Sequence, residues 1–269
     1  MFYHAQNGKL EFEETDMDYI CFGRGEKNLI FIPGLGDGLK TVKGTAVAFA
    51  LMYRIYALKY RVFVFSRKNL LPEGYSTRDM ANDVKEAMVR LKIAKADIIG
   101  VSQGGMIAQY LAIDYPAMVH KLILAVTSPR PNETLTAAAE HWIALARSGD
   151  YKNIFIDTAE RSYTDRYLKK FRRLYPVLTR LGKPRDFDRF IIQADACIRH
   201  NAIDELDKIK CPACIIGADN DKIVGRNASL EIADRIEGSR IFIYPDMGHG
   251  VYEEAKDFNE RVLNFLDAQ

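Results

Sequence analysis

The chain has 269 residues, 48% of them hydrophobic, and a formal net charge of +2 at pH 7. That length suits one large α/β domain, or such a domain with an insertion. The small net charge gives no reason to expect a nucleic-acid partner or an anionic membrane surface. The first residues lack a charged-then-apolar signal pattern, and no apolar run approaches the length of a membrane span. We therefore expect a cytoplasmic protein with no membrane association.

The cysteines are too few and too scattered for a disulfide framework; they are Cys21, Cys197, Cys211 and Cys214. Cys211 and Cys214 do have C-x-x-C spacing, which can indicate redox chemistry or half of a metal site. No second pair and no nearby histidine supplies further ligands, and the pair lies at the entry to an apolar strand. The sequence predicts neither a metal nor a cofactor.

Apolar runs alternate with segments of helical spacing in the first half of the chain. Two short strands at 9–13 and 17–22 should pair antiparallel. Continuous apolar runs, typical of strands buried on both faces, follow at 28–32, 61–66, 97–101 and 122–126. Helical segments are expected at 41–59, from the capping-box pattern at Ser76 to Leu91, and directly after residue 102.

The alternation then stops and later resumes. Residues 130–208 contain only helical patterns, at 133–147, 151–158, 163–175 and 186–200. Strands at 213–217 and 241–244 follow, with helices at 226–236 and 252–267. This order predicts an α/β fold with a mostly parallel sheet flanked by helices. The core would comprise 1–129 and 209–269, and 130–208 would be an all-helical insertion over one end of the sheet.

The strand at 97–101 ends in Gly100-Val-Ser102-Gln-Gly104, and a helical pattern begins at once. A serine on so tight a turn has a strained backbone, and the glycines let strand and helix pass closely. The geometry raises the Ser102 hydroxyl above the sheet and directs the Gln103 amide to the same point, as a serine nucleophile requires. The alternative interpretation is a glycine-rich loop that contains a serine with no catalytic role.

Polar residues follow the last two predicted strands, where ligands of parallel sheets bind. One segment offers Asp219 and Asp221, and the other offers Asp246 and His249. A serine nucleophile needs a histidine base, which in turn needs a carboxylate to fix its tautomer. The remaining histidines are better explained as surface or cap residues; they are His4, His120, His141 and His200. From the residues alone the acid could be any of the three aspartates.

At this point the sequence resembles the α/β-hydrolase superfamily, on both sides of the insertion. The resemblance rests on the Ser102 pentapeptide, on Gly217-Ala-Asp-Asn-Asp221-Lys-Ile-Val and on Gly248-His249. It implies a catalytic triad of Ser102, His249 and Asp221, since an acid followed by x-Ile/Val-Val is the family's usual pattern. It also implies an oxyanion hole formed by the amides of Gln103 and Leu35, and a helical cap at 130–208.

Two segments depart from that pattern. Pro33 replaces the usual histidine of the oxyanion loop, although the donor is a backbone group and should survive. The loop at 66–76 lacks the usual Asp-x-Arg-Gly-x-Gly-x-Ser sequence. Because that loop borders the site, the second departure affects the substrate assignment more than the chemistry.

We expect a serine hydrolase that acts on a small-molecule carboxylic ester, with thioesters and lactones as close alternatives. An acyltransferase would use the same triad, and a non-catalytic binding protein would use the same fold. The segment from Gly34 to Thr41 nearly fits a phosphate-binding G-x-x-x-x-G-K-[ST] loop, but Leu39 stands where glycine is needed. Some aromatic residues of the insertion should line the substrate pocket, the alternative being plain helix packing; they are Trp142, Tyr151, Phe155, Tyr163, Tyr167, Phe171, Tyr175, Phe187 and Phe190.

Overall fold

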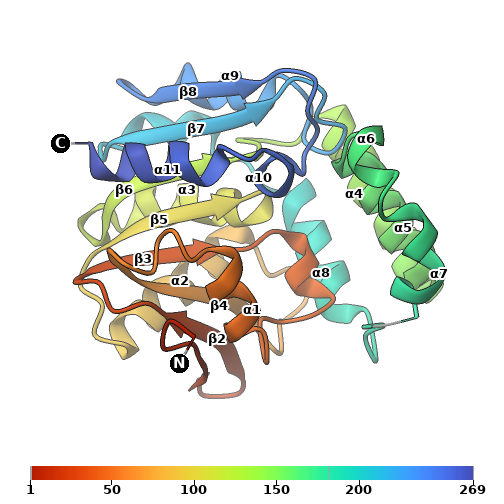
Figure 1. Cartoon of the computed structure of the whole chain (residues 1–269), viewed down its shortest axis with the longest axis horizontal. Helices are drawn as coiled ribbons and strands as arrows, with labels where there is room; N and C mark the ends of the chain where they lie inside the picture. The colour runs from red at the N-terminus through yellow and green to blue at the C-terminus, as the bar shows by residue number, and fades with distance from the viewer. Residues whose placement is uncertain (1, 181, 269) are drawn as a thin grey trace.

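An eight-stranded sheet forms the centre of the protein (Figure 1). The structure is a computed structural model that describes residues 2–180 and 182–268. The strand order is β1-β2-β4-β3-β5-β6-β7-β8. The pairs β1–β2 and β2–β4 are antiparallel and the others are parallel, which confirms the predicted mostly parallel α/β sheet. The strands are β1 (Gln6–Glu11), β2 (Asp16–Phe22), β3 (Lys27–Ile32), β4 (Tyr60–Lys68), β5 (Ala96–Val101), β6 (Val119–Ala125), β7 (Ala213–Ala218) and β8 (Arg240–Tyr244).

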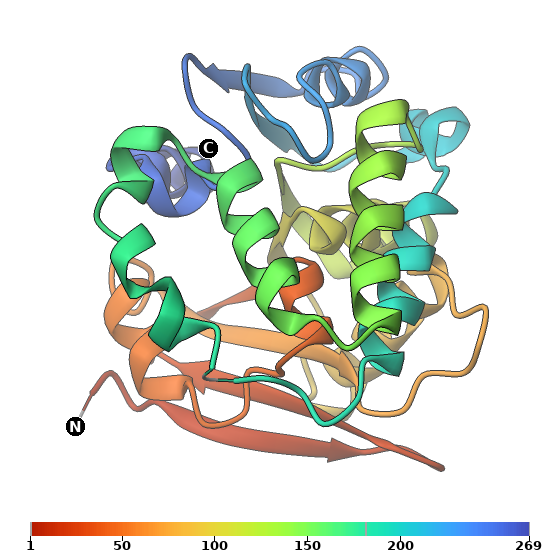
Figure 2. The ribbon, with the colours of Figure 1, turned by 90° about the vertical axis from the view of Figure 1, so that its right-hand side faces the viewer.

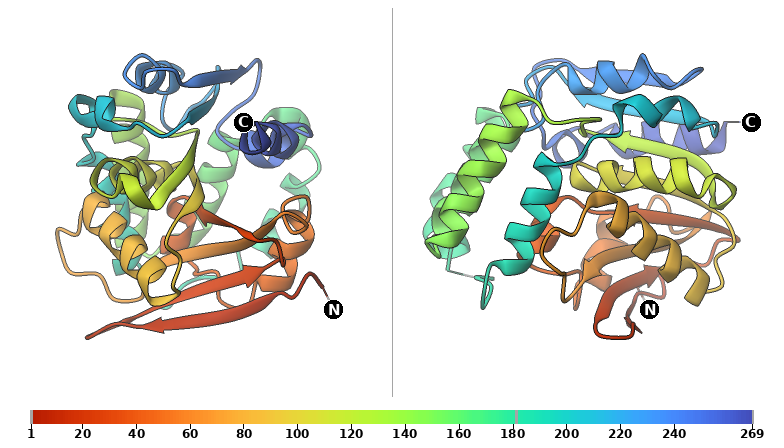
Figure 3. Two further views of the ribbon diagram at one scale, coloured as in Figure 1. Left: turned by 90° about the vertical axis from the view of Figure 1, so that its left-hand side faces the viewer. Right: turned by 180° about the vertical axis from the view of Figure 1, so that it is seen from behind.

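Helices cover both faces of the sheet. Helices α1 and α11 lie on the face turned to the viewer in Figure 1, and α2, α3 and α9 lie on the opposite face, seen from behind in Figure 3. The helices of the two faces are α1 (Ala46–Met52), α2 (Thr77–Arg90), α3 (Gln103–Asp114), α9 (Ala228–Ala233) and α11 (Phe258–Asp267). Three short 3-10 helices lie in the connections between strands and helices; they are η1 (Leu35–Gly38), η2 (Pro116–Met118) and η4 (Ile203–Lys208).

The alternation of side chains along β3 shows why its apolar run is continuous. Ile30 and Ile32 belong to the core under α2 and α3, whereas Leu29 and Phe31 belong to the core under α1 and α11. Successive residues of a strand point to opposite faces, so a strand covered on both sides must be apolar at every position. Each fully buried aliphatic side chain contributes about 1.5–3 kcal/mol.

A helical region lies across the carboxyl ends of the strands (Figures 1 and 2). Between β6 and β7, the described residues form helices and turns but no strand. The elements are α4 (Glu133–Arg147), α5 (Tyr151–Ser162), α6 (Asp165–Leu168), η3 (Arg172–Leu174), α7 (Tyr175–Leu178) and α8 (Asp188–Ile198). Trp142 and Phe190 of this region pack in one cluster with Met106 and Ile223 of the sheet domain. The region is therefore fastened to the domain by apolar contacts.

Several predicted helices are shorter or divided in the structure, among them 226–236, of which α9 covers Ala228–Ala233. The segment 41–59 is helical only in α1; the helix cannot begin before Gly44, whose φ is +80°, and residues 53–59 form turns. The segment 163–175 divides into α6 and η3; of it only Leu168 is buried, so packing does little to hold one continuous helix. The segment 252–267 divides into α10 (Val251–Glu254) and α11, because the chain is extended at Ala255 (ψ 119°).

Candidate active site

Ser102 lies on the tight turn between β5 and α3, with φ 55° and ψ −121°. Such a conformation costs a non-glycine residue about 1–3 kcal/mol. A Cβ at Gly100 would lie 2.5 Å from the carbonyl oxygen of Gly104, and one at Gly104 would lie 1.9 Å from the carbonyl oxygen of Ile32. The predicted reason for these two glycines is therefore confirmed: strand and helix pass too closely for any side chain.

The two residues whose amides the sequence predicts as oxyanion donors, Gln103 and Leu35, each begin a helix near Ser102. Gln103 is the first residue of α3 and Leu35 the first of η1, so neither N–H has a partner within its own helix. The turn before Leu35 lies against the serine, since a Cβ at Gly34 would be 3.2 Å from Ser102 Cβ and 3.7 Å from its Oγ. Gln103 follows Ser102 directly, and the turn that precedes Leu35 packs against the Ser102 side chain.

The structure distinguishes the three candidate aspartates by their contacts. Asp221 Oδ2 lies 2.8 Å from Nδ1 of His249, and both side chains are buried. The other carboxylate oxygen, Oδ1, accepts hydrogen bonds from the amides of Ile223 at 2.8 Å and Val224 at 3.0 Å. These amides fix the carboxylate, so the x-Ile-Val sequence after Asp221 has a direct structural role.

The other two aspartates contact each other instead of the histidine. Asp219 Oδ1 accepts the backbone N–H of Asp246 at 2.8 Å. Asp246 has a φ of +57°, a conformation that aspartate tolerates better than most residues. This pair closes the turn that carries the chain from β8 towards His249.

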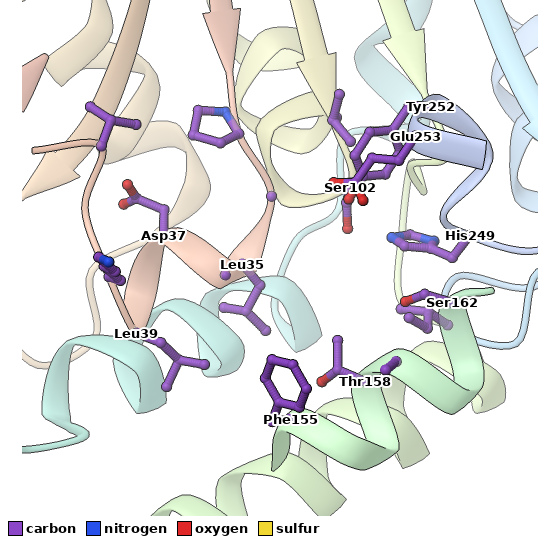
Figure 4. A pocket seen from close by; sticks show the side chains of 18 of the residues that line it. Leu35, Asp37, Leu39, Ser102, Phe155, Thr158, Ser162, His249, Tyr252 and Glu253 are labelled. Atoms are coloured by element: carbon purple, nitrogen blue, oxygen red, sulfur yellow. The ribbon is translucent and has the colours of Figure 1, made fainter. Parts of the chain in front are cut away.

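Ser102 and His249 line a common cavity of about 520 Å³ (Figure 4). Within the described part of the chain, no hydrogen bond joins the serine hydroxyl to the imidazole. Such bonds are often long in unliganded sites and form when substrate binds. The cavity lies between the sheet domain and the helical region, and its walls include four of the aromatic residues that the sequence suggested; they are Trp142, Phe155, Tyr163 and Phe190.

Arg67 is a site residue that the sequence did not reveal. It is 2% exposed, and its Nη2 donates to the Pro33 carbonyl at 2.5 Å and to Oε1 of Gln103 at 2.8 Å. Burial lowers the pKa of its guanidinium to about 10. Arg67 thus links the loop before Leu35 to Gln103. Only the departure of the 66–76 loop from its family pattern pointed to this segment.

Asp37 completes this buried arrangement. Its Oδ2 accepts the Arg67 backbone N–H at 3.0 Å and pairs with Nη2 of Arg189 at 2.5 Å. Arg189 also donates to the carbonyl oxygen of Arg67 at 2.9 Å. Since Arg189 belongs to α8, these bonds fasten the helical region to the oxyanion loop.

Two other sequence features have structural explanations. His200 lies within the segment 130–208 but is only 1% exposed, so the alternative that it is a surface residue is wrong; its Nδ1 lies 2.8 Å from Oγ1 of Thr77 and its Nε2 lies 3.2 Å from Oε1 of Gln109. Burial raises the pKa of the Cys211 thiol to about 11 and that of Cys214 to about 12, which disfavours the reactive thiolates. Residues 2–180 and 182–268 contain no cluster of potential metal ligands and no helix suited to crossing a membrane.

Comparison with known proteins agrees with this geometry. Residues 27–146 match the family model described as the alpha/beta hydrolase fold. A 2-hydroxy-6-oxononadienedioate/2-hydroxy-6-oxononatrienedioate hydrolase from Escherichia coli is 26% identical, over 91% of this chain and 88% of the relative.

Two solved structures match over nearly the whole chain. MGS-M2, an alpha/beta hydrolase enzyme from a Medee basin deep-sea metagenome library, has a TM-score of 0.86 at 20% identity and covers 97% of this chain and 98% of its own. The enol-lactonase from Burkholderia xenovorans LB400 has a TM-score of 0.80 at 21% identity and covers 97% and 100%. Together with the parallel sheet and the strand–turn–helix at Ser102, these matches show that the chain has the α/β-hydrolase fold.

Proposed function

We propose that the protein is a serine hydrolase that cleaves a carboxylic ester, a thioester or a lactone of a small molecule through an acyl-enzyme. The observation that carries the proposal is the contact of 2.8 Å between Asp221 Oδ2 and His249 Nδ1, because His249 lines the same cavity as Ser102. With Nδ1 directed to the carboxylate, Nε2 is the nitrogen left to act as the base. The solved relative named as an enol-lactonase supports hydrolysis of this bond type.

Each residue has a defined role in this reaction. Ser102 Oγ attacks the carbonyl carbon while His249 Nε2 accepts its proton, and Asp221 stabilises the imidazolium. The amides of Leu35 and Gln103 donate to the oxyanion of the tetrahedral intermediate. His249 then protonates the leaving group, and the acyl-enzyme forms. A water molecule deprotonated by His249 releases the acid and regenerates Ser102.

We further propose that residues 130–208 act as a cap that selects the substrate, with 1–129 and 209–269 as the catalytic core. Helices α4 and α5 contribute Trp142, Ile154, Phe155 and Thr158 to the cavity wall. A pocket of this size lined mainly by apolar side chains suits a small or medium acyl group.

The test is turnover of a p-nitrophenyl ester series of increasing acyl length, with one thioester and one lactone. Ser102→Ala should reduce kcat by at least about 10⁴-fold while the thermal unfolding curve remains cooperative. A fluorophosphonate probe should label the native protein and leave the variant unlabelled. Ester hydrolysis by Ser102→Ala at the native rate would contradict the proposal, and an unlabelled native protein would favour a binding role instead.

A further inference from the structure

Glu253 is a carboxyl group on the cavity wall that the proposed reaction does not use. It belongs to α10, the short helix that follows His249, and Figure 4 shows its side chain among those that line the pocket. The side chain is accessible to solvent, yet burial among the surrounding atoms raises the pKa of its carboxyl.

The helical region holds this carboxyl in place. The Tyr163 hydroxyl, just after α5, donates to Glu253 Oε2 at 2.5 Å. The Tyr163 ring reaches this position because residue 250 is glycine, where a Cβ would lie 2.3 Å from Tyr163 Cε1. The glycine after His249 therefore makes room for the residue that orients Glu253.

Aromatic rings surround the same part of the cavity. Tyr163 and Tyr252 line it beside Glu253, and Phe49 and Tyr53 line it from the side of α1. Burial and the Glu253 charge together raise the pKa of the phenols of Tyr53 and Tyr252, so these rings stay neutral. The faces of neutral aromatic rings attract cations, and a carboxylate beside them adds a full negative charge.

We propose that Glu253 is a specificity-determining residue that gives the cavity a preference for esters carrying a positively charged ammonium group. This inference rests on the proposed ester hydrolysis. A carboxylate facing a largely apolar cavity loses much of its hydration, and a bound ammonium group restores a favourable partner. The aromatic rings contact the alkyl groups of the same cation, as in sites for quaternary ammonium ligands.

Lys40 also lines the cavity and would favour the opposite charge. Its side chain is exposed, and no ion pair or hydrogen bond of its ammonium group occurs among the described residues. Glu253 is also exposed, but the Tyr163 hydroxyl orients its carboxyl group, and Tyr163 and Tyr252 line the cavity beside it. Only Glu253 combines a fixed position with an environment suited to an oppositely charged ligand.

The experiment compares the hydrolysis of butyrylcholine with that of its uncharged isostere, 3,3-dimethylbutyl butyrate, at about pH 8. The native kcat/KM ratio should favour the cationic ester by roughly tenfold or more, and Glu253→Gln should bring the ratio to about 1. Glu260→Gln removes the same charge from an exposed position of α11 and should leave the native ratio unchanged. A native ratio near 1, or a ratio that survives Glu253→Gln, would overturn the inference.

Two further measurements separate this inference from the proposed reaction. Tetramethylammonium should bind the catalytically inactive Ser102→Ala protein in calorimetry, and roughly tenfold more weakly when Glu253→Gln is added. If neither ester is hydrolysed and the fluorophosphonate probe does not label the protein, the proposed hydrolase reaction is refuted. The calorimetry would still decide whether Glu253 recognises a cation. A preference for a succinate monoester would assign charge recognition to Lys40 and refute the role of Glu253.

Discussion

Replacing Arg67 with methionine should change the stability of the fold only slightly but reduce kcat clearly. Arg67 Nη2 donates to the Pro33 carbonyl at 2.5 Å and to Gln103 Oε1 at 2.8 Å, so one guanidinium connects the two segments that contain the proposed oxyanion amides. Methionine retains most of the side-chain volume and provides no donor. Asp37 keeps its charged partner, because Arg189 lies 2.5 Å from its Oδ2.

Two opposing terms set the effect of Arg67→Met on stability. Losing two hydrogen bonds from a charged donor costs about 1.5–3 kcal/mol each, or about 3–6 kcal/mol together. Burial lowers the Arg67 pKa to about 10, so the charged group itself costs the native state about 3 kcal/mol, which the variant recovers. The free energy of unfolding should therefore fall by only about 0–3 kcal/mol. With the Leu35 and Gln103 amides less firmly placed, kcat should fall by about 10- to 100-fold, less than the loss of a whole oxyanion donor.

The assay measures kcat on the best p-nitrophenyl ester and the urea midpoint on the same preparations. Arg199→Met is the matched control, because that arginine is 43% exposed, forms an ion pair with Asp195 of α8 and donates to the Gly74 carbonyl at 3.3 Å. The control should change stability by about 0.5 kcal/mol or less and leave kcat at the native value. Native kcat in folded Arg67→Met would refute a positioning role for Arg67. Destabilisation well above about 3 kcal/mol would show that its burial costs less than we infer.

Three further substitutions test separate parts of the structure. Asp221→Asn should reduce kcat by about 10³- to 10⁴-fold with little change in Tm, because the base loses its fixed tautomer. Gly104→Ala should lower the free energy of unfolding, measured in urea, by about 3 kcal/mol or more, since its Cβ would lie 1.9 Å from the Ile32 carbonyl oxygen. Gly36→Ala is the control and should be nearly neutral, because a Cβ at Gly36 has no atom within 4 Å. Burial lowers the pKa of His200 to about 3 from an ordinary 6.5, so the unfolded chain binds a proton that the native state does not, and stability should fall as the pH drops from 6.5 towards 3. The loss should reach about 2 kcal/mol at pH 5, and His200→Asn should flatten this decline.

The sheet could be predicted because its signal is local. A strand covered on both faces is apolar at every position, and each buried strand that we expected is present with small shifts of its ends. Helix lengths were less predictable, because apolar spacing continues through residues whose backbone cannot be helical. Gly44, with a φ of +80°, is such a residue, and the neighbouring residue types do not indicate that α1 begins only after it.

The same contrast applies to the candidate site. Ser102, Asp221 and His249 follow strand ends in a fixed order, and the structure brings the last two into contact as the sequence suggested. Arg67 has no such signal, because its partners are a carbonyl oxygen 34 positions away and an amide 36 positions away. Contacts of that kind depend on how the loops fold over the sheet, which residue types and spacing do not encode.

The two adjacent glutamates of α10, Glu253 and Glu254, have different roles: one has a structural contact, and the other is the proposed recognition residue. Successive helical residues point about 100° apart, so Glu253 and Glu254 cannot face the same surroundings. Glu254 accepts the Thr164 backbone N–H at 3.1 Å and thereby fastens the helical region to α10, whereas Glu253 accepts the Tyr163 hydroxyl and lines the cavity. Both contacts reach the segment after α5, and α10 directly follows His249. The helix that contacts the helical region therefore also carries the proposed recognition carboxyl close to the proposed base His249, so a substrate bound at Glu253 would be placed within reach of the proposed reacting groups.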